Sequence, residues 1–315
     1  MKKIISILLC LVLVFGMTGC GSSDSSRPSG NSGQTNTNSS AENNNSSTPS
    51  GSGKQETKGP EYTIADHVVV DNDSCKMTVI SCTAKKNGGV DIKVQLENKT
   101  ADKTLMFAWE DVAVNGWMVD PFFAESVAPG KKANDTISFS KSDFEECNLT
   151  TADKVEFELR VYDYNDWLAD AVVDDVFCIY PTGMEDAAVK SPERVSNKDE
   201  VVIVDNDQCS FVIVKSYVDK IWGYTLTVYM ENKSDINLMF DWDDVSVNGF
   251  MIDPFWATSL SAGNKRIAEI DFSNSSFEEN GIKDVEEIEF KLRIHDNDKW
   301  DAKDIVNDVF SYQPK

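Results

Sequence analysis

The stretch W-E-D-V-A-V-N-G-W-M-V-D-P-F-F at residues 109–123 returns as W-D-D-V-S-V-N-G-F-M-I-D-P-F-W at residues 242–256. In each copy an Asn-Gly pair stands between apolar-rich flanks, at 115–116 and at 248–249. Asn-Gly supplies the two residues of positive φ that a type I′ turn requires, so each copy predicts a β-hairpin. One structural unit is therefore written twice along this chain.

The likeness between the two copies extends well beyond the hairpin. Val70 and Val204 occupy matching positions 134 residues apart, and one extra residue in the first copy makes the later offset 133. A period this long indicates tandem domains, because solenoid repeats span only about 20–50 residues. We expect repeat 1 at 61–182 and repeat 2 at 199–315, joined by a linker at 183–198.

Short runs of alternating apolar and polar residues predict half-buried strands in both repeats. The alternation at 90–96 matches that at 224–230, where Thr225, Thr227 and Tyr229 are expected to point outward. Each repeat holds about seven or eight such runs, separated by Gly, Pro, Asn and Asp and without long helices. The sequence therefore predicts an all-β protein, with two tandem immunoglobulin-like antiparallel β-sandwiches after a signal peptide and a disordered tether.

Two smaller features are predicted in each repeat. The apolar phase slips by one residue at the acidic pairs 110–111 and 243–244, and a β-bulge would absorb that slip. Ser142 and Ser275 each precede a Glu by three residues, which is the spacing of a capping box. We therefore expect one short helix in each repeat.

The N-terminus has the pattern of a signal peptide. Lys2 and Lys3 precede an apolar run at 4–17, which is shorter than the roughly 20 residues of a membrane span. Small residues then lead to Cys20 at the start of a polar Gly/Ser stretch, as in the lipobox of bacterial lipoproteins. We expect cleavage after a signal peptide at 1–19, diacylation of Cys20 and anchoring by these two acyl chains.

Residues 20–60 follow as a segment rich in Ser, Asn, Gly, Thr and Gln, with scattered charges and no aromatic or branched aliphatic side chain. Such a segment cannot bury a core, so we predict a disordered tether that holds the repeats away from the membrane. The net charge of −23 argues against a nucleic-acid partner. Only Cys75 and Cys209 among the remaining cysteines occupy matching positions, so no disulfide framework is expected.

A lipobox, a Ser/Asn/Gly tether and immunoglobulin-like modules built around V-N-G-x-M-x-D-P resemble the tandem β-sandwich surface lipoproteins of Gram-positive bacteria. The resemblance covers the whole mature chain. It implies attachment to the cell membrane through the N-terminal lipid, on the extracellular side. The family is mostly of unknown function, so the resemblance carries over no catalytic residue.

Catalytic motifs are poorly represented. His67 and His295 stand at positions that do not match between the repeats, which disfavours a His-based catalytic arrangement. Ser138 and Lys141 have the S-x-x-K spacing of penicillin-binding enzymes but lack the companion motifs. The sequence predicts no enzyme and no cofactor.

Carboxylates near predicted strand ends raise the alternative of a bound calcium ion, because calcium takes clusters of oxygen ligands. Asp and Asn also cap turns through their own backbone, which is the competing interpretation. The predicted calcium ligands are Asp71, Asp73 and Asp163 in repeat 1, and Asp205, Asp207 and Asp296 in repeat 2.

Tryptophans divide into two groups. Those that recur in both repeats are expected in the cores, namely Trp109, Trp167, Trp242 and Trp300. Those that do not recur are candidate ligand contacts, namely Trp222, Trp117 and Trp256. Trp222 stands in a turn, where a large ring has little core to reach.

These patterns together predict a non-catalytic binding or adaptor module, anchored to the membrane, whose partner is an envelope protein or a glycan. One alternative is a carbohydrate-binding module of a secreted glycan-degrading system, which would present a flat row of exposed aromatic rings on one sheet. The other alternative is a passive structural spacer, which would lack an apolar patch larger than a few hundred Å².

Overall fold

The computed structural model describes residues 60–299 and 301–314. The predicted signal peptide, Cys20, the tether up to residue 59 and Trp300 lie outside these residues. No helix in the described ranges is long and apolar enough to cross a bilayer. Both repeats belong to one compact unit.

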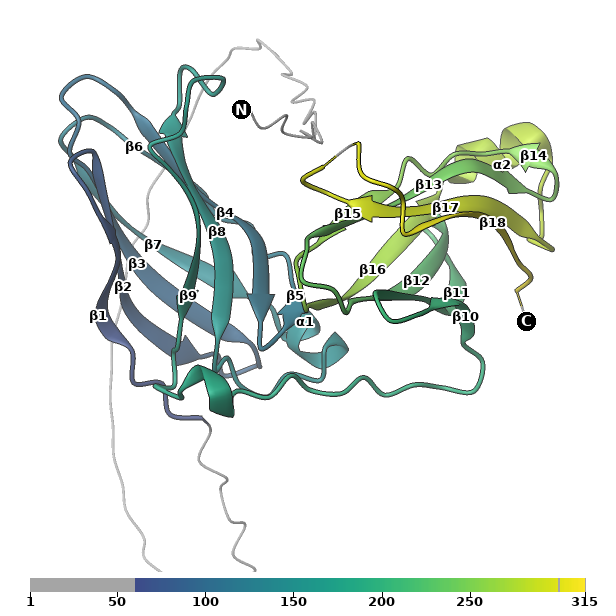
Figure 1. The fold of residues 1–315 in the computed structure, drawn as a ribbon, viewed down its shortest axis with the longest axis horizontal. Coiled ribbons are helices and arrows are strands. Elements are labelled where there is room, and N and C mark those ends of the chain that lie inside the picture. The colour runs from purple at the N-terminus through teal and green to yellow at the C-terminus, as the bar shows by residue number, and fades with distance from the viewer. Residues whose placement is uncertain (1–59, 300, 315) are drawn as a thin grey trace, which may run out of the picture. The chain divides into compact units, whose positions relative to one another are not determined.

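Repeat 1 is a sandwich of two antiparallel layers of strands (Figure 1). One layer has the order β1-β2-β3-β7, and in the other β4 pairs with β5, β6 and β8 while β8 pairs with β9. The elements are β1 (Ala65–Asp71), β2 (Cys75–Ala84), β3 (Val90–Asn98), β4 (Leu105–Val114), β5 (Trp117–Met118), β6 (Ala124–Val127), β7 (Lys132–Phe139), α1 (Lys141–Glu146), β8 (Val155–Asp163) and β9 (Val173–Ile179).

Repeat 2 follows the same plan after a short 3₁₀ turn, η1 (Asp186–Ala188), in the linker. One layer has the order β10-β11-β12-β16, and the other has the order β14-β13-β17-β18 with β15 also on β13. The elements are β10 (Val201–Asp205), β11 (Cys209–Asp219), β12 (Gly223–Asn232), β13 (Leu238–Val247), β14 (Phe250–Met251), β15 (Ala257–Leu260), β16 (Lys265–Phe272), α2 (Asn274–Asn280), β17 (Ile288–Asp296) and β18 (Val306–Tyr312).

The predicted all-β fold of antiparallel sandwiches is confirmed. The architecture is immunoglobulin-like, while the strand order is its own. In immunoglobulin domains the second and third strands lie on opposite sheets, whereas β2 and β3 are neighbours here, as are β11 and β12.

A tryptophan at the same position of β4 and β13 packs at the centre of each sandwich. Trp109 stacks on Phe157 with ring centroids 3.5 Å apart, and Trp242 stacks on Phe290 at 3.8 Å. The predicted core positions of these two tryptophans are confirmed. The same prediction is wrong for Trp167, which is exposed because it lies in a turn beyond the end of β8.

The hairpin and bulge predictions are confirmed. Asn115 and Gly116 have φ of 50° and 83°, and the pair at 248–249 has 51° and 83°. The β4–β8 ladder shifts register between Glu110 and Ala113, and the β13–β17 ladder does so at the equivalent place. These local features follow from Asn-Gly chemistry and from the phase of the apolar residues.

The predicted helix starts are two residues too late. The capping box of α1 is formed by Ser140 and Asp143, whose side chains bond each other's backbone N–H groups, and not by Ser142. α2 has Ser273 as its N-cap without a side-chain cap bond. Each helix is preceded by two serines that could serve as its N-cap, Ser140 and Ser142 in repeat 1 and Ser273 and Ser275 in repeat 2. In both repeats the helix begins after the earlier serine, directly after the end of the preceding strand.

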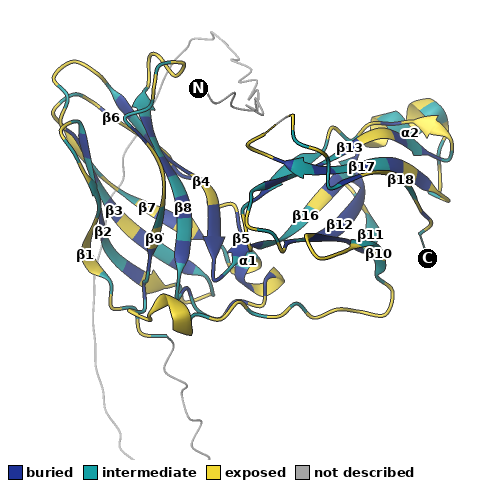
Figure 2. Ribbon diagram, viewed as in Figure 1, coloured by how far each residue is buried: buried dark blue, intermediate teal, exposed yellow. Residues whose placement is uncertain are grey.

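Strand β12 differs from its sequence pattern, because both of its faces are buried (Figure 2). Thr225, Thr227 and Tyr229 were expected to face solvent, and all three are buried. Tyr229 is covered from the linker and from repeat 1, since the Arg194 guanidinium lies 4.4 Å from its ring centroid and Trp117 lies 5.9 Å away. At Tyr229 the outer face of this sheet is therefore part of an interface with the linker and repeat 1.

Strand β5 of repeat 1 forms the other side of that interface. It pairs in parallel with β16 at one position, Trp117 against Lys265, so that strands of both repeats share one nine-stranded sheet. The Lys265 N–H donates to the carbonyl oxygen of Gly116 at 2.9 Å. A hairpin tip of one repeat is thus added to the sheet edge of the other.

Candidate functional site

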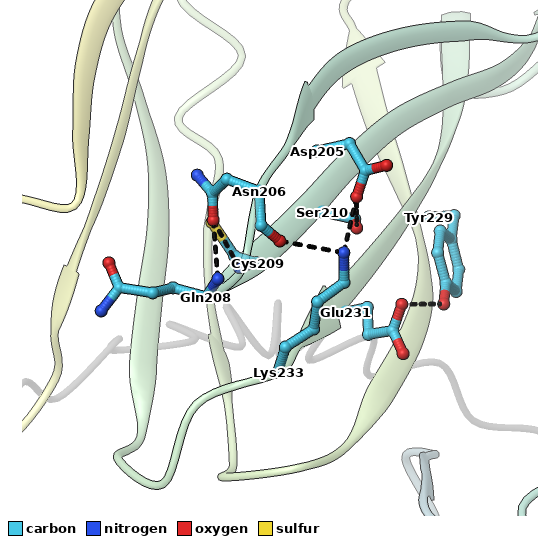
Figure 3. A network of polar contacts seen from close by, with 8 residues as sticks. All are labelled: Asp205, Asn206, Gln208, Cys209, Ser210, Tyr229, Glu231 and Lys233. Carbon is cyan, nitrogen blue, oxygen red and sulfur yellow. Dashed lines mark hydrogen bonds and ion pairs between the residues drawn. The ribbon is translucent and has the colours of Figure 1, made fainter.

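The predicted calcium ligands at the start of each repeat are paired with lysines. In repeat 2, Asp205 accepts hydrogen bonds from Lys233 and from the Ser210 hydroxyl (Figure 3). In repeat 1, Asp71 contacts Lys99 and Lys76 in the same way. Hydrogen bonds from these lysines, with Lys99 and Lys233 the largest causes, hold the pKa of both carboxyls below the usual value.

Two of the remaining predicted ligands also lie near lysines. Asp163 lies 3.6 Å from the Lys103 ammonium, and Asp296 lies 3.5 Å from that of Lys299. Asp73 and Asp207 are exposed in the neighbouring turns. Among residues 60–299 and 301–314, no group of three or more His, Cys, Asp or Glu side chains could hold a metal ion. The expected three-carboxylate sites are therefore not formed in this part of the chain. The carboxylates pair with lysines instead, and Asp163 and Asp296 also accept hydrogen bonds from backbone N–H groups of the following turns.

Trp117 is inaccessible to a ligand. Its side chain is 0% exposed, and its indole Nε1–H donates to the Pro192 carbonyl of the linker at 3.0 Å. The Lys265 ammonium lies 5.8 Å from the ring centroid. The prediction of ligand binding here is corrected to a structural role, because Trp117 fills the contact between the repeats.

Trp256 is half-buried and lines a groove of about 580 Å³. One edge of its ring system packs against Phe211 and Trp242 in the core of repeat 2. The groove is also lined by cations and hydroxyls of repeat 2, among them Arg266, Lys215 and Thr227, and by acids of repeat 1. An aromatic wall with convergent polar groups can hold a polar ligand.

The acids of this groove are electrostatically constrained. Burial raises the pKa of Glu146, and the nearby Glu269 carboxylate raises it further. Asp120 forms an ion pair with Arg266 across the two repeats. Arg266, Glu146 and Asp120 were not identified from the sequence, because only the packing of two repeats brings them together.

Trp222 stands at the tip of the β11–β12 hairpin and is 64% exposed. Its neighbour Ile221 is 78% exposed, and Val218 on the same hairpin is exposed as well. The sequence pointed to Trp222 and missed the two aliphatic residues, although an Ile-Trp pair in a turn is itself a signal. We call these three exposed apolar side chains at the end of one hairpin the β11–β12 tip.

The backbone of the β11–β12 tip is held in place by two devices. The Asp219 carboxylate accepts from the N–H groups of Ile221 at 2.7 Å and Trp222 at 2.8 Å, which lowers its pKa. Gly223 has φ of 101°, and a Cβ there would lie 2.2 Å from the Phe272 carbonyl oxygen, so only glycine fits. A rigid apolar tip loses little conformational entropy when it docks.

The two histidines lie in different repeats. His67 is on β1 of repeat 1, and His295 is on β17 of repeat 2, with its Nδ1 3.5 Å from Asp241 Oδ2. Burial raises the pKa of Asp241 to about 6, although Arg293 opposes the shift. Burial and the same arginine lower the pKa of His295. The surroundings therefore favour the neutral forms of both groups.

The raised pKa of Asp241 predicts a measurable pH dependence of stability. Below about pH 3.8 the carboxyl is protonated whether the chain is folded or unfolded, and it has no effect. Between pH 3.8 and 6 the unfolded chain ionises first, so the folded state loses stability, and above pH 6 the loss is complete. Asp241→Asn should therefore stabilise repeat 2 at pH 7.5 by about 1 kcal/mol after allowance for solvent screening.

Urea unfolding of both proteins at pH 4 and pH 7.5 measures this difference. The substitution Asp308→Asn, at an exposed position on β18 of the same repeat, is the control and should show no such gain. An equal effect of Asp241→Asn at both pH values would contradict the assignment.

No protein-family model matches the chain, and no curated protein is similar to it. Among solved structures, a red sea bream transglutaminase aligns with 72% of this chain at 10% identity and a TM-score of 0.19. The alignment spans 29% of the transglutaminase chain. A likeness this low carries no argument about function, so the architecture rests on the strands described above.

Proposed function

We propose that this protein is a lipid-anchored, extracytoplasmic and non-catalytic adaptor that holds an envelope protein at its β11–β12 tip. The carrying observation is the tip itself, with Trp222, Ile221 and Val218 exposed on a backbone fixed by Asp219 and Gly223. Rigid Trp anchors dominate the energetics of protein interfaces. The lipobox at Cys20 and the tether give such an adaptor its reach from the membrane.

The distribution of exposed aromatic rings favours a protein partner over a flat glycan chain. In the described residues these rings lie in turns, in loops or in the two-residue strand β14, and none follows a sheet face. They are Phe122, Tyr164, Trp167, Trp222, Phe250 and Phe255. The apolar tip likewise disfavours a passive spacer.

A glycan is the second candidate ligand, and the groove at Trp256 is the observation that favours it. Its aromatic wall, threonine hydroxyls and paired charges suit a polar, uncharged ligand such as a sugar. A glycan array probed with the full chain and with Trp256→Ala tests this candidate.

A photo-crosslinking amino acid placed at position 222 should label an envelope protein in intact cells. The same amino acid at the exposed Trp167 of repeat 1 is the matched control and should label little. Ile221→Ser should reduce labelling from position 222 by about tenfold, as expected for loss of a hot-spot contact, while thermal stability stays within about 0.5 kcal/mol. Equal labelling from 222 and 167, or labelling of glycan alone, would overturn the proposal.

Cys20→Ala should move the protein from the membrane fraction to the medium or the soluble envelope fraction, because only the acyl chains hold it. Detergent-free fractionation with an antibody against the repeats measures this shift. Retention of the variant in the membrane would remove lipid anchoring from the proposal and leave the β11–β12 tip to be judged separately.

A further inference from the structure

The tips of the two Asn-Gly hairpins have the same sequence plan and opposite surroundings. In repeat 1, Trp117 is 0% exposed and Met118 is also buried. The matching residues of repeat 2, Phe250 and Met251, are 46% and 70% exposed. We call this pair of apolar residues after the Asn-Gly turn the plug. Repeat 1 buries its plug against repeat 2, whereas repeat 2 exposes its own plug to solvent.

The surface of repeat 2 that covers Trp117 and Met118 shows what kind of surface a plug can bind. Tyr229 provides an aromatic ring 5.9 Å from that of Trp117, and the Ser261 N–H lies 3.3 Å from the Met118 sulfur. Strand β16 supplies the edge, because the Lys265 N–H donates to the carbonyl oxygen before Trp117. The receiving surface is thus a sheet edge with an aromatic residue beside it.

Two acids flank the first plug and bind the same surface. Asp120 forms an ion pair with Arg266, and Asp111 accepts from the Ser259 hydroxyl at 3.0 Å. The matching acids of repeat 2 are Asp253 and Asp244, and both are exposed. The second plug therefore retains the apolar tip and the flanking negative charge of the first.

A second copy of this chain does not offer the matching edge. In repeat 1 the strands equivalent to β12 and β16 are β3 and β7, and there Gln95 stands for Tyr229 and Asn134 for Ile267, in the same cross-strand register. Gln95 and Asn134 bond each other at 3.1 Å. Ala133 stands for Arg266, so the cation is missing too.

We infer that the β13–β14 hairpin is a docking plug for a different β-sandwich. The exposed edge strand of that sandwich carries a branched aliphatic side chain and an arginine opposite Asp253, and the strand next to it carries an aromatic side chain, as β16 and β12 do here. The edge pairs in parallel and donates a backbone N–H to the Gly249 carbonyl, as β16 does to Gly116. Phe250 and Met251 fill the apolar part of the contact. The residues of this plug differ from those of the β11–β12 tip, and the inference does not depend on the proposed function.

The inference can be tested by building such an edge onto repeat 1 of the full chain. Gln95→Tyr, Ala133→Arg and Asn134→Ile transfer the receiving residues of repeat 2 to β3 and β7, at positions that are exposed or half-buried. The β14 plug of one molecule should then dock on the grafted edge of the next, in a head-to-tail association. Sedimentation velocity should show the average mass of the grafted chain rising at least about twofold towards 200 µM, while the wild type stays monomeric.

Two further substitution pairs show which surface is responsible. Phe250→Ser with Met251→Ser in the grafted chain should restore the monomer, whereas Ile221→Ser with Trp222→Ser should leave the association intact. Trp117→Ser with Met118→Ser removes the plug of repeat 1 from the edge strand β16. Strand β16 then becomes a second receiving surface, and sedimentation velocity again measures the association. Circular dichroism confirms that each compared variant is folded. A folded grafted chain that stays monomeric, or one whose association ignores the Phe250 and Met251 substitutions, would overturn the inference.

Discussion

Trp117→Ala is expected to destabilise the protein by about 3–5 kcal/mol through loss of the contact between the two repeats. The substitution removes a fully buried indole between the repeats, together with its hydrogen bond to Pro192 and its contact with Tyr229. The cavity would open at the interface, because each repeat keeps a tryptophan-centred core of its own around Trp109 or Trp242. Differential scanning calorimetry should show a lower melting temperature for both repeats than in the wild type.

Phe250→Ala is the matched control for this experiment, because it changes the same hairpin position in repeat 2. Its side chain is 46% exposed, so the expected cost is below about 1 kcal/mol. Equal costs for the two substitutions would show that the contact of Trp117 with repeat 2 contributes little in solution.

Trp109→Ala is expected to cost a similar 3–5 kcal/mol, but within repeat 1 alone. The ring stacks on Phe157 at 3.5 Å and meets Phe123 edge-on at 6.0 Å, so the substitution leaves a cavity between the two layers of strands. The buried indole nitrogen has no hydrogen-bond partner, and the loss is therefore one of packing.

Hydrogen exchange resolves where this loss occurs. Protection should fall across β4 and β8 and change little in β13 and β17. Trp167→Ala provides the control, because the exposed turn of that residue should tolerate the change within about 0.5 kcal/mol. A uniform loss of protection over both repeats would mean that they unfold as one cooperative unit.

The sequence contained the repeat, the strands and the hairpins because these depend on neighbours along the chain. Asn-Gly turns need only the φ preferences of two residues, and the bulges at Asp111 and Asp244 follow from a phase slip within one strand. The alternation of apolar residues predicted the inward faces of β3 and β8 for the same reason. Trp222 could be singled out because a large ring in a turn has no core to reach.

The tertiary structure decided which of these surfaces meet. Trp117 and Phe250 share one sequence pattern, yet one is buried and the other exposed, because only repeat 2 carries Tyr229 and Arg266 where repeat 1 has Gln95 and Ala133. The same contact buries the outer face of β12 and forms the groove at Trp256. The acids that were expected around calcium pair with lysines that lie up to 163 − 103 = 60 residues away in sequence. Periodicity describes which side of a strand is apolar, but contacts across more than a hundred residues depend on three-dimensional packing, which no local pattern contains.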